Sequence, residues 1–233
     1  DQVFKKVGME PTGDPFNSLM KLENTDSSPY NPMINAGAIV VASCLASEIS
    51  FDTMLDTIRA LCMDPDINLD KKVYHSEMSH ISRNRAIAYL LESKGYIEKN
   101  KDVENSLHFY VKMCSLSVTA ESLAGLGLIL ANDGIHPDTG KRLLSSQAVK
   151  IVKTLMFTCG MYDGSGEFAV RVGIPSKSGV GGGILSVVDG EMGIGIFGPA
   201  LDKKGNSVAG ECVLEYMSHE LHLHMFDPQR HTL

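Results

Sequence analysis

The sequence predicts an α+β fold in which a long helical region precedes a three-stranded antiparallel sheet flanked by helices. Three observations support this prediction. Apolar residues recur at helical spacing from about residue 36 to residue 158. After Gly166 the pattern changes to short β-rich runs, two of which are separated by Asp189-Gly190, a dipeptide typical of two-residue hairpin turns. A last helical stretch covers about residues 208–225.

The elements follow from local signals along the chain. Residues 1–35 are expected to be irregular, because prolines and glycines interrupt any long element there. Ser50 and Ser145 are the expected N-caps, and Gly95 and Gly134 the expected helix stops. The expected helices are 36–48, 51–63, 75–94, 103–114, 119–132, 145–158 and 208–225, and the expected strands are Phe168–Ile174, Gly183–Val188 and Met192–Phe197.

We expect one domain over residues 1–233, with a mainly helical part at 36–158 and the strands with the last helix at 167–226. Three strands make a thin sheet for a domain of this size. The chain begins at Asp1, with neither an initiator Met nor a signal peptide. We therefore expect an N-terminally truncated domain whose first strands precede Asp1.

Composition excludes several classes of protein. A formal net charge of −7 in 233 residues argues against nucleic acid as a partner, because phosphate binding needs a basic surface. The longest apolar run, Ala36–Ala46, is too short for a membrane span and contains Ser43. The five cysteines are odd in number, scattered and without Cys-x-x-Cys spacing, which indicates reduced thiols in a cytosol-like compartment and no metal site.

The segment Lys177-Ser-Gly-Val-Gly-Gly-Gly183 is the most informative motif. Glycine lets a ligand approach the backbone closely, and preorganised N–H groups stabilise a developing oxyanion. The segment therefore indicates a serine acyl-transfer enzyme. A strand kink and a phosphate-binding loop are the alternatives. The phosphate loop is disfavoured, because no Gly-Lys-Ser/Thr occurs and the glycines do not open a helix.

Glu77 and Asn84 lie seven residues apart in one expected helix, so both should point the same way from an otherwise apolar stripe. Polar groups on such a stripe need partners or a polar pocket, which favours a ligand site. The simpler interpretation is that Glu77 is exposed and interacts with the N-terminal helix dipole.

Three further residues have both a structural and a functional interpretation. Asn35 precedes an apolar helix and would be its N-cap, a position that is compatible with contacting a carboxylate ligand. Tyr110 belongs to the apolar stripe of helix 103–114 and would ordinarily be a core tyrosine. Tyr162, in a turn-rich loop, could reach the Lys177 segment and transfer protons, or could be an exposed loop residue.

Two motifs are rejected as catalytic sites. Ser18-Leu-Met-Lys21 matches Ser-x-x-Lys, but the polar residues and Pro29 that follow leave room only for a short helix, whereas that mechanism needs a serine at the start of a buried helix. His219-Glu-Leu-His222-Leu-His224 is one residue short of His-Glu-x-x-His, so a solvated helix end explains it better.

Together, the ordered motifs resemble the β-lactamase-like serine glutaminases, of bacterial type, over essentially the whole chain. The motifs are Val7-Gly-Met-Glu-Pro-Thr-Gly-Asp-Pro-Phe-Asn17, Asn31-Pro-Met-Ile-Asn-Ala-Gly-Ala38, Ser76-Glu77 with Arg83-Asn84-Arg-Ala-Ile-Ala88, Phe109-Tyr110 before Cys114-Ser115, Cys159-Gly-Met-Tyr162, Lys177–Gly183 and Leu201-Asp-Lys-Lys-Gly-Asn-Ser207. The resemblance implies a multi-layer α/β/α fold of the β-lactamase and penicillin-binding-protein type. It also implies hydrolysis of L-glutamine to L-glutamate and ammonia through a glutamyl-serine intermediate, without cofactor or metal.

The resemblance also implies roles for single residues. Asn35, Glu77, Asn84 and Tyr110 would hold the α-amino and α-carboxylate groups of the amino acid, with Glu77 pairing with the ammonium. Tyr162 would lie beside the nucleophile and assist proton transfer, and the backbone N–H of Val180 would contribute to the oxyanion hole. In the family, the nucleophilic Ser-x-x-Lys lies upstream of the Asn35 motif, so we expect it to precede Asp1 and this chain alone to be inactive. Homo-oligomers, tetramers or dimers, are usual in the family, in the cytoplasm or, in eukaryotes, the mitochondrion.

Two other functions remain open at this point. A penicillin-recognising serine hydrolase shares the fold and the Lys-Ser/Thr-Gly strand, although no Ser-Asp-Asn occurs here. A non-catalytic family member that only binds glutamine or glutamate, or that pairs with intact subunits, is the second.

Overall fold

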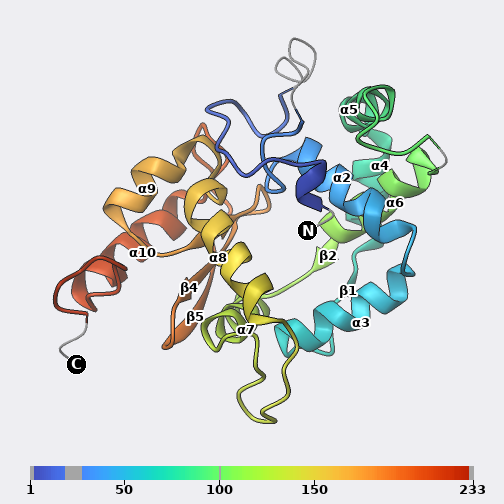
Figure 1. The fold of residues 1–233 in the computed structure, drawn as a ribbon. Helices are drawn as coiled ribbons and strands as arrows, with labels where there is room; N and C mark the ends of the chain where they lie inside the picture. The colour runs from blue at the N-terminus through green and yellow to red at the C-terminus, as the bar shows by residue number, and fades with distance from the viewer. Residues whose placement is uncertain (1–2, 19–27, 100, 231–233) are drawn as a thin grey trace. The chain divides into compact units, whose positions relative to one another are not determined.

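The computed structural model describes residues 3–18, 28–99 and 101–230 (Figure 1). The chain divides into two compact units. Unit 1 comprises Asp1–Ile58 and Asp66–Ser117, and unit 2 comprises Arg59–Pro65 and Val118–Leu233. This division differs from the boundary expected at residue 158, because the last two helices of the expected helical part group with the sheet. Each unit is described by itself below.

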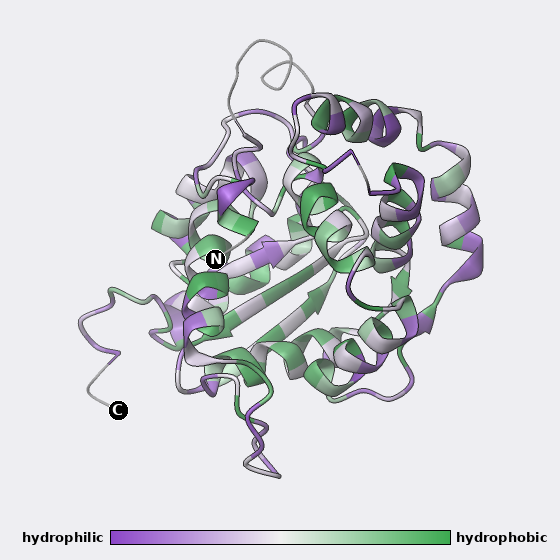
Figure 2. Cartoon of the chain, turned by 45° about the vertical axis from the view of Figure 1, so that its right-hand side comes forward, coloured by the Kyte–Doolittle hydropathy of each residue, from purple (hydrophilic) through white to green (hydrophobic). Residues whose placement is uncertain are grey.

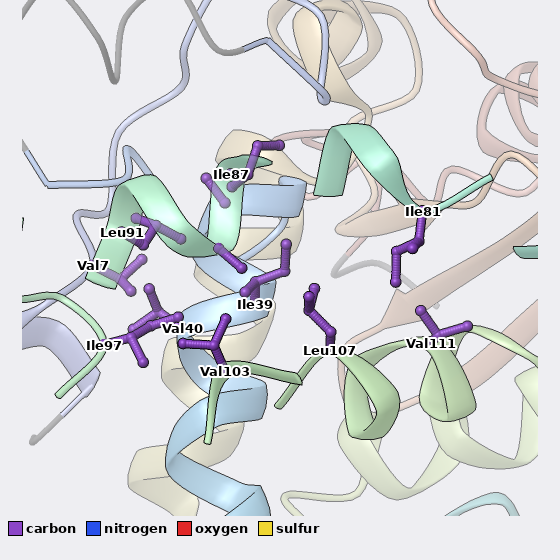
Figure 3. Packing of buried hydrophobic residues seen from close by; sticks show 12 residues of the cluster. Val7, Ile39, Val40, Ile81, Ile87, Leu91, Ile97, Val103, Leu107 and Val111 are labelled. Carbon is purple, nitrogen blue, oxygen red and sulfur yellow. The ribbon is translucent and has the colours of Figure 1, made fainter. Parts of the chain in front are cut away.

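Unit 1 is mainly helical and has one buried apolar core. Its side chains come mostly from α2, α5 and α6, where residues such as Ile39, Leu91 and Leu107 have no exposed surface (Figure 3). The elements of unit 1 are the 3-10 turn η1 (Val3–Lys5), α2 (Asn35–Ala46), α3 (Phe51–Cys62, which extends into unit 2), α4 (Lys71–Ser79), α5 (Ser82–Ser93), α6 (Val103–Cys114), and the paired strands β1 (Asn68–Leu69) and β2 (Leu116–Ser117).

The helix expected over 75–94 is in fact two helices, α4 and α5, separated at His80 and Ile81. Side chains end α4, because the Ser79 hydroxyl donates to the Ser76 carbonyl at 2.7 Å and His80 Nδ1 lies 2.9 Å from the same oxygen. Such local bonds compete with the helical ladder. Ile81, only 3% exposed, turns into the core toward Leu107 and Val111 of α6 (Figure 3).

Unit 2 contains an antiparallel sheet in which, among the described residues, the strand order is β3-β4-β5. The sheet strands are mostly coloured as apolar or pale in Figure 2, whereas the surrounding helices mix apolar and polar residues. The elements of unit 2 are α7 (Ala120–Ala131), α8 (Ser146–Cys159), the 3-10 turn η2 (Tyr162–Gly164), α9 (Ser165–Arg171), β3 (Ser176–Ser178), β4 (Gly183–Val188), β5 (Met192–Phe197) and α10 (Val208–Glu220).

The sequence of β5 explains how helices cover both faces of this sheet. Its large residues alternate with glycine, so Ile194 points to one face, toward the core that α9 and α10 share. Gly193 and Gly195 point to the other face, where α7 packs. A Cβ atom on Gly195 would lie 1.8 Å from the carbonyl oxygen of Ala120 in α7. Glycine at this position therefore lets the helix backbone rest directly on the strand.

The strand expected over Phe168–Ile174 is wrong, because this segment contributes to helix α9. Apolar residues at 168, 170, 172 and 174 fit a period of two. In the structure, however, Phe168 and Val172 are buried while Val170 is 79% exposed, which is the i, i+4 pattern of a helix. An ion pair between Glu167 and Arg171, also at i, i+4, lies on the solvent side.

One turn and one helix boundary also differ from the prediction. The hairpin between β4 and β5 has a three-residue loop, Asp189 to Glu191, in place of the two-residue turn. Gly190 has φ +74° there, and the N–H of Glu191 donates to the Val188 carbonyl at 3.0 Å. The last helix, α10, ends at Glu220, five residues before the expected end. The other helices and the strands β4 and β5 are confirmed within one or two residues.

Among the described residues, no single helix has the length and apolar character needed to cross a membrane. The consecutive helices α2 and α3 meet these criteria only as a pair, and they are bent by 114° relative to each other.

Replacing Gly195 with Ala is expected to destabilise the protein by about 1–3 kcal/mol or more, because the added methyl group overlaps main-chain atoms of α7 that cannot move independently. Chemical denaturation of purified variants measures this. Gly166→Ala is the matched control, since nothing lies within 4 Å of its added Cβ in helix α9. We expect this control to be neutral or to stabilise by up to about 1 kcal/mol. Equal effects of both substitutions would contradict the close packing of α7 on β5.

Candidate functional site

In unit 1 the structure brings Asn35 and Asn84 together. The side-chain amide of Asn35 donates from Nδ2 to Oδ1 of Asn84 at 2.9 Å, and the Asn35 backbone N–H donates to the Phe16 carbonyl at 3.1 Å. Asn35 is the first residue of α2 and not its N-cap. Ile34 occupies that position and its side chain makes no capping bond. The half-buried amide pair leaves further donor and acceptor capacity on both side chains for a polar ligand.

The loop before α2 is tied to the same place. Nε of Arg83, the residue before Asn84, donates to the Asn17 carbonyl at 2.7 Å. Together with the bond from Asn35 to Phe16, this holds the backbone at residues 16 and 17 beside the amide pair. Sequence reasoning assigned no role to Arg83, and its only signal was its place in the Arg83-Asn84 motif.

Glu77 does not interact with a helix N-terminus as the simpler interpretation expected, because α4 begins at Lys71 and Glu77 lies in its last turn. A carboxylate is unfavourable near the negative end of a helix dipole. Its side chain is exposed and forms no ion pair with the residues that the structure describes. Glu77 is thus available for a cationic group. The argument that Glu77 and Asn84 share one helix face is wrong, since they belong to α4 and α5.

Tyr110 lies near the C-terminal end of α6, is half-buried and packs against the apolar core of unit 1. This agrees with the structural interpretation of its place in the apolar stripe. The aromatic ring is thereby held in place on a helix of the same unit as Asn35, Glu77 and Asn84.

In unit 2, Tyr162 and the Lys177 segment meet as expected. The Tyr162 hydroxyl donates to the Ser178 carbonyl at 3.3 Å. Lys177 Nζ lies 4.4 Å from the centre of the Tyr162 ring and donates to the same Ser178 carbonyl. Tyr162 has φ +54°, a conformation that is strained for a non-glycine residue and occurs disproportionately at functional sites. The loop residue is thus neither fully exposed nor free.

The glycine-rich segment forms a tight turn after β3. The N–H of Gly182 donates to the Gly179 carbonyl at 2.9 Å, and Gly182 has φ +95°, which favours glycine. Val180, between them, is 52% exposed. Its backbone N–H finds no acceptor within the described parts of the chain. A Cβ on Gly179 or Gly181 would meet nothing within 4 Å, so the backbone here is open to a ligand.

Of the two rejected motifs, the first is described only at Ser18, whose backbone N–H donates to the Pro15 carbonyl; Lys21 lies outside the described residues. His222 Nδ1 lies 3.1 Å from an Asp227 carboxylate oxygen. Across residues 3–18, 28–99 and 101–230, no group of three histidine, cysteine or acidic side chains is arranged to hold a metal ion.

The buried cysteines offer little as nucleophiles. None of the five cysteines forms a disulfide, and Cys62 and Cys159 are buried. Burial, with a smaller contribution from the nearby Asp64 carboxylate, raises the pKa of the Cys62 thiol to about 11. The reactive species is the thiolate, so Cys62 is inert at neutral pH.

Three comparisons identify similar proteins. A model of the glutaminase family matches residues 1–226. A curated glutaminase of Clostridioides difficile is 54% identical over 230 residues, which cover 97% of this chain and 74% of that protein. The crystal structure of a probable glutaminase of Bacillus subtilis has a TM-score of 0.91 and 40% identity over 97% of this chain and 76% of its own. A further crystal structure, of a Bacillus subtilis glutaminase in covalent complex with 5-oxo-L-norleucine, formed by reaction with 6-diazo-5-oxo-L-norleucine, has a TM-score of 0.84 and 37% identity over 97% of this chain and 74% of its own.

Iodoacetamide at pH 8 is expected to label Cys114 and Cys212, which are exposed, and to leave Cys62 unmodified in the folded protein. A pKa of about 11 leaves roughly one Cys62 thiol in a thousand ionised at that pH, and burial hinders reagent access as well. Peptide mass spectrometry measures the labelling, and unfolding in urea should make all five cysteines reactive. Rapid labelling of Cys62 in the folded protein would contradict its burial.

Proposed function

The chain belongs to the glutaminase family, and from this premise we propose that its protein hydrolyses L-glutamine to L-glutamate and ammonia with the site residues named above. Its fold is the β-lactamase-like fold of the solved glutaminases. The observation that carries the proposal is the pairing of a strained tyrosine with an open, glycine-rich turn, because acyl transfer needs a proton-transfer group beside main-chain donors for an oxyanion.

In this proposal, Glu77 pairs with the α-ammonium group of glutamine. Its exposed carboxylate, in the last turn of α4, forms no ion pair with the described residues, which supports that role. Asn35 and Asn84 donate to and accept from the α-carboxylate and α-amino groups through the amide capacity that their mutual bond leaves over. Tyr110 completes the group from α6 with its ring fixed by the core.

The chemistry proceeds by acyl transfer. A serine hydroxyl attacks the γ-amide carbonyl carbon, the carbonyl oxygen becomes an oxyanion, and the backbone N–H of Val180 donates to it. The C–N bond breaks as the nitrogen takes a proton and leaves as ammonia, and water then hydrolyses the glutamyl ester to release glutamate. Tyr162 transfers the protons beside the serine, and the positive charge of Lys177 over its ring stabilises negative charge developing there.

Oligomeric state and location are also proposals. We infer from the family resemblance that the protein assembles as a homodimer or homotetramer in the cytoplasm. The absence of a disulfide among the five cysteines is consistent with a reducing compartment. Sedimentation of the purified protein tests the assembly. A single monomeric species at micromolar concentration would overturn it.

Ammonia release from L-glutamine is the direct test of the activity. It should be measured for the 233-residue chain and for a form extended upstream by the sequence that its gene encodes there. Since the resemblance places the nucleophilic Ser-x-x-Lys before Asp1, we expect only the extended form to be active. If neither form releases ammonia, a chromogenic lactam and glutamate-dependent thermal stabilisation distinguish the hydrolase and binding alternatives.

The nucleophile itself can be located by trapping. We expect 6-diazo-5-oxo-L-norleucine to add covalently to the extended form, with the modified peptide upstream of Asp1. Peptide mass spectrometry identifies the site without assuming which serine reacts. Modification of Ser18 would show that rejecting Ser18-x-x-Lys21 was wrong, and Ser18→Ala should then abolish activity.

Glu77→Gln in the extended form is expected to raise the KM for glutamine about tenfold or more, because it removes the charge that pairs with the ammonium. Steady-state kinetics measures this. Glu48→Gln is the matched control, since Glu48 is also an exposed carboxylate of unit 1 and lies beyond the C-terminal end of α2, away from Asn35. Equal KM values for both variants would contradict the role of Glu77.

A further inference from the structure

The loop Leu201–Ser207, between β5 and α10, contains a motif to which no role has been given so far. Its central feature is Asn206, which has no exposed surface. The backbone N–H of Asn206 donates to Oδ1 of Asp202 at 2.8 Å, and its carbonyl accepts from the Asp202 N–H at 2.8 Å. Asp202 thereby closes the loop around Asn206 and fixes the direction of its side chain.

The side-chain amide of Asn206 uses both of its ends. Its Oδ1 accepts from the Ser178 hydroxyl at 2.6 Å, and its Nδ2 donates to the Met161 carbonyl at 3.3 Å. Ser178 is the last residue of β3, and Met161 immediately precedes the η2 turn. One buried amide thus links the end of the strand to the beginning of the turn. A buried amide left with one bond unmade would be destabilising.

The two residues that bond to the Asn206 side chain, Met161 and Ser178, are each linked directly to Tyr162. Met161 is its neighbour in the chain, and Ser178 supplies the carbonyl that accepts its hydroxyl. The influence of Asn206 on Tyr162 therefore passes through Met161 and Ser178.

The strained backbone of Tyr162 explains why such a link is needed. A φ of +54° is strained and persists only where the surroundings determine it. Within the turn, the Ser165 hydroxyl donates to the Tyr162 carbonyl at 2.8 Å and accepts from the Met161 N–H at 3.0 Å. These bonds are local to residues 161–165. The bonds of the Asn206 side chain attach this turn to β3, the strand that leads into the glycine-rich segment Gly179–Gly183.

We propose that Asn206 is a positioning residue for the reaction, which holds the Tyr162 turn and the Ser178 end of β3 in one fixed relation. The inference rests on the proposed function, because Tyr162 is proposed there to transfer protons. The role requires an amide. Aspartate could accept from Ser178 but could not donate to the Met161 carbonyl, and it would bury an additional charge.

The test uses the form extended upstream, with Asn206→Ala and Asn206→Asp. We expect kcat to fall about tenfold to a hundredfold with KM nearly unchanged, since substrate-binding groups stay in place while proton transfer is misaligned. The control is Ser186→Ala, which removes a buried hydroxyl that bonds to Ser176 at 2.7 Å in the same sheet. That variant should lose stability but keep the kcat of the folded protein. A kcat unchanged in the Asn206 variants would overturn the inference while the proposed function stands.

A double-mutant cycle with Tyr162→Phe separates positioning from a general structural role. If Asn206 acts through the Tyr162 hydroxyl, Asn206→Ala should reduce kcat much less in the Tyr162→Phe background than in the wild type. Equal reductions in both backgrounds would overturn the inference. Should Asn206→Ala fail to fold, Asn206→Asp supplies the same cycle.

A readout that does not depend on turnover distinguishes failure of the inference from failure of the proposed function. The 13Cζ chemical shift of Tyr162, assigned by its loss in Tyr162→Phe, reports the surroundings of the phenol. We expect it to change in Asn206→Asp and to stay the same in Ser186→Ala. An unchanged shift in Asn206→Asp would overturn the inference whether or not the protein hydrolyses glutamine.

Discussion

The arrangement of the proposed catalytic groups in unit 2 depends on Ser178. Its backbone N–H bonds to the Gly160 carbonyl, its hydroxyl to Asn206, and its carbonyl receives both the Tyr162 hydroxyl and the Lys177 ammonium. Because Ser178 is 2% exposed, these bonds form away from water, where each is stronger and an unpaired partner is more costly. The strand, the turn at Tyr162 and the loop at Asn206 therefore cannot shift independently.

The same constraint accounts for the open turn that follows. Once Ser178 is fixed, Gly179–Gly182 can close a tight turn in which the Val180 N–H has no acceptor among the described residues. The pairing of β3 with β4 ends at Ser178, so the Val180 N–H is left available. In unit 1, comparable order comes from apolar packing, because α2, α5 and α6 share one core and so bring the amide groups of Asn35 and Asn84 within 2.9 Å. In both units, rigid packing of helices and strands holds the polar groups in place.

Prediction from the sequence succeeded where one local signal had one interpretation. Helix 103–114 has a clear apolar stripe, and Ser145 begins α8 as its N-cap, with its hydroxyl accepting from the Ala148 N–H. It failed where the signal was ambiguous. Apolar residues at 168 and 172 fit both a strand and a helix. The break at His80 and Ile81 arises from side-chain bonds to the Ser76 carbonyl, which helical periodicity does not register.

The family motifs, most helix and strand positions, and the residue types that we propose bind an amino acid and stabilise an oxyanion could be predicted from the sequence, because these depend on local composition and spacing. The tertiary structure was needed to show that Asn35 pairs with Asn84, that Glu77 lies at the end of α4 with no ion-pair partner among the described residues, and that Asn206 links Ser178 to the Tyr162 turn. The physical reason is that hydrogen bonds between residues 28 to 49 positions apart follow from how helices and strands pack, and packing depends on buried shape rather than on any one segment.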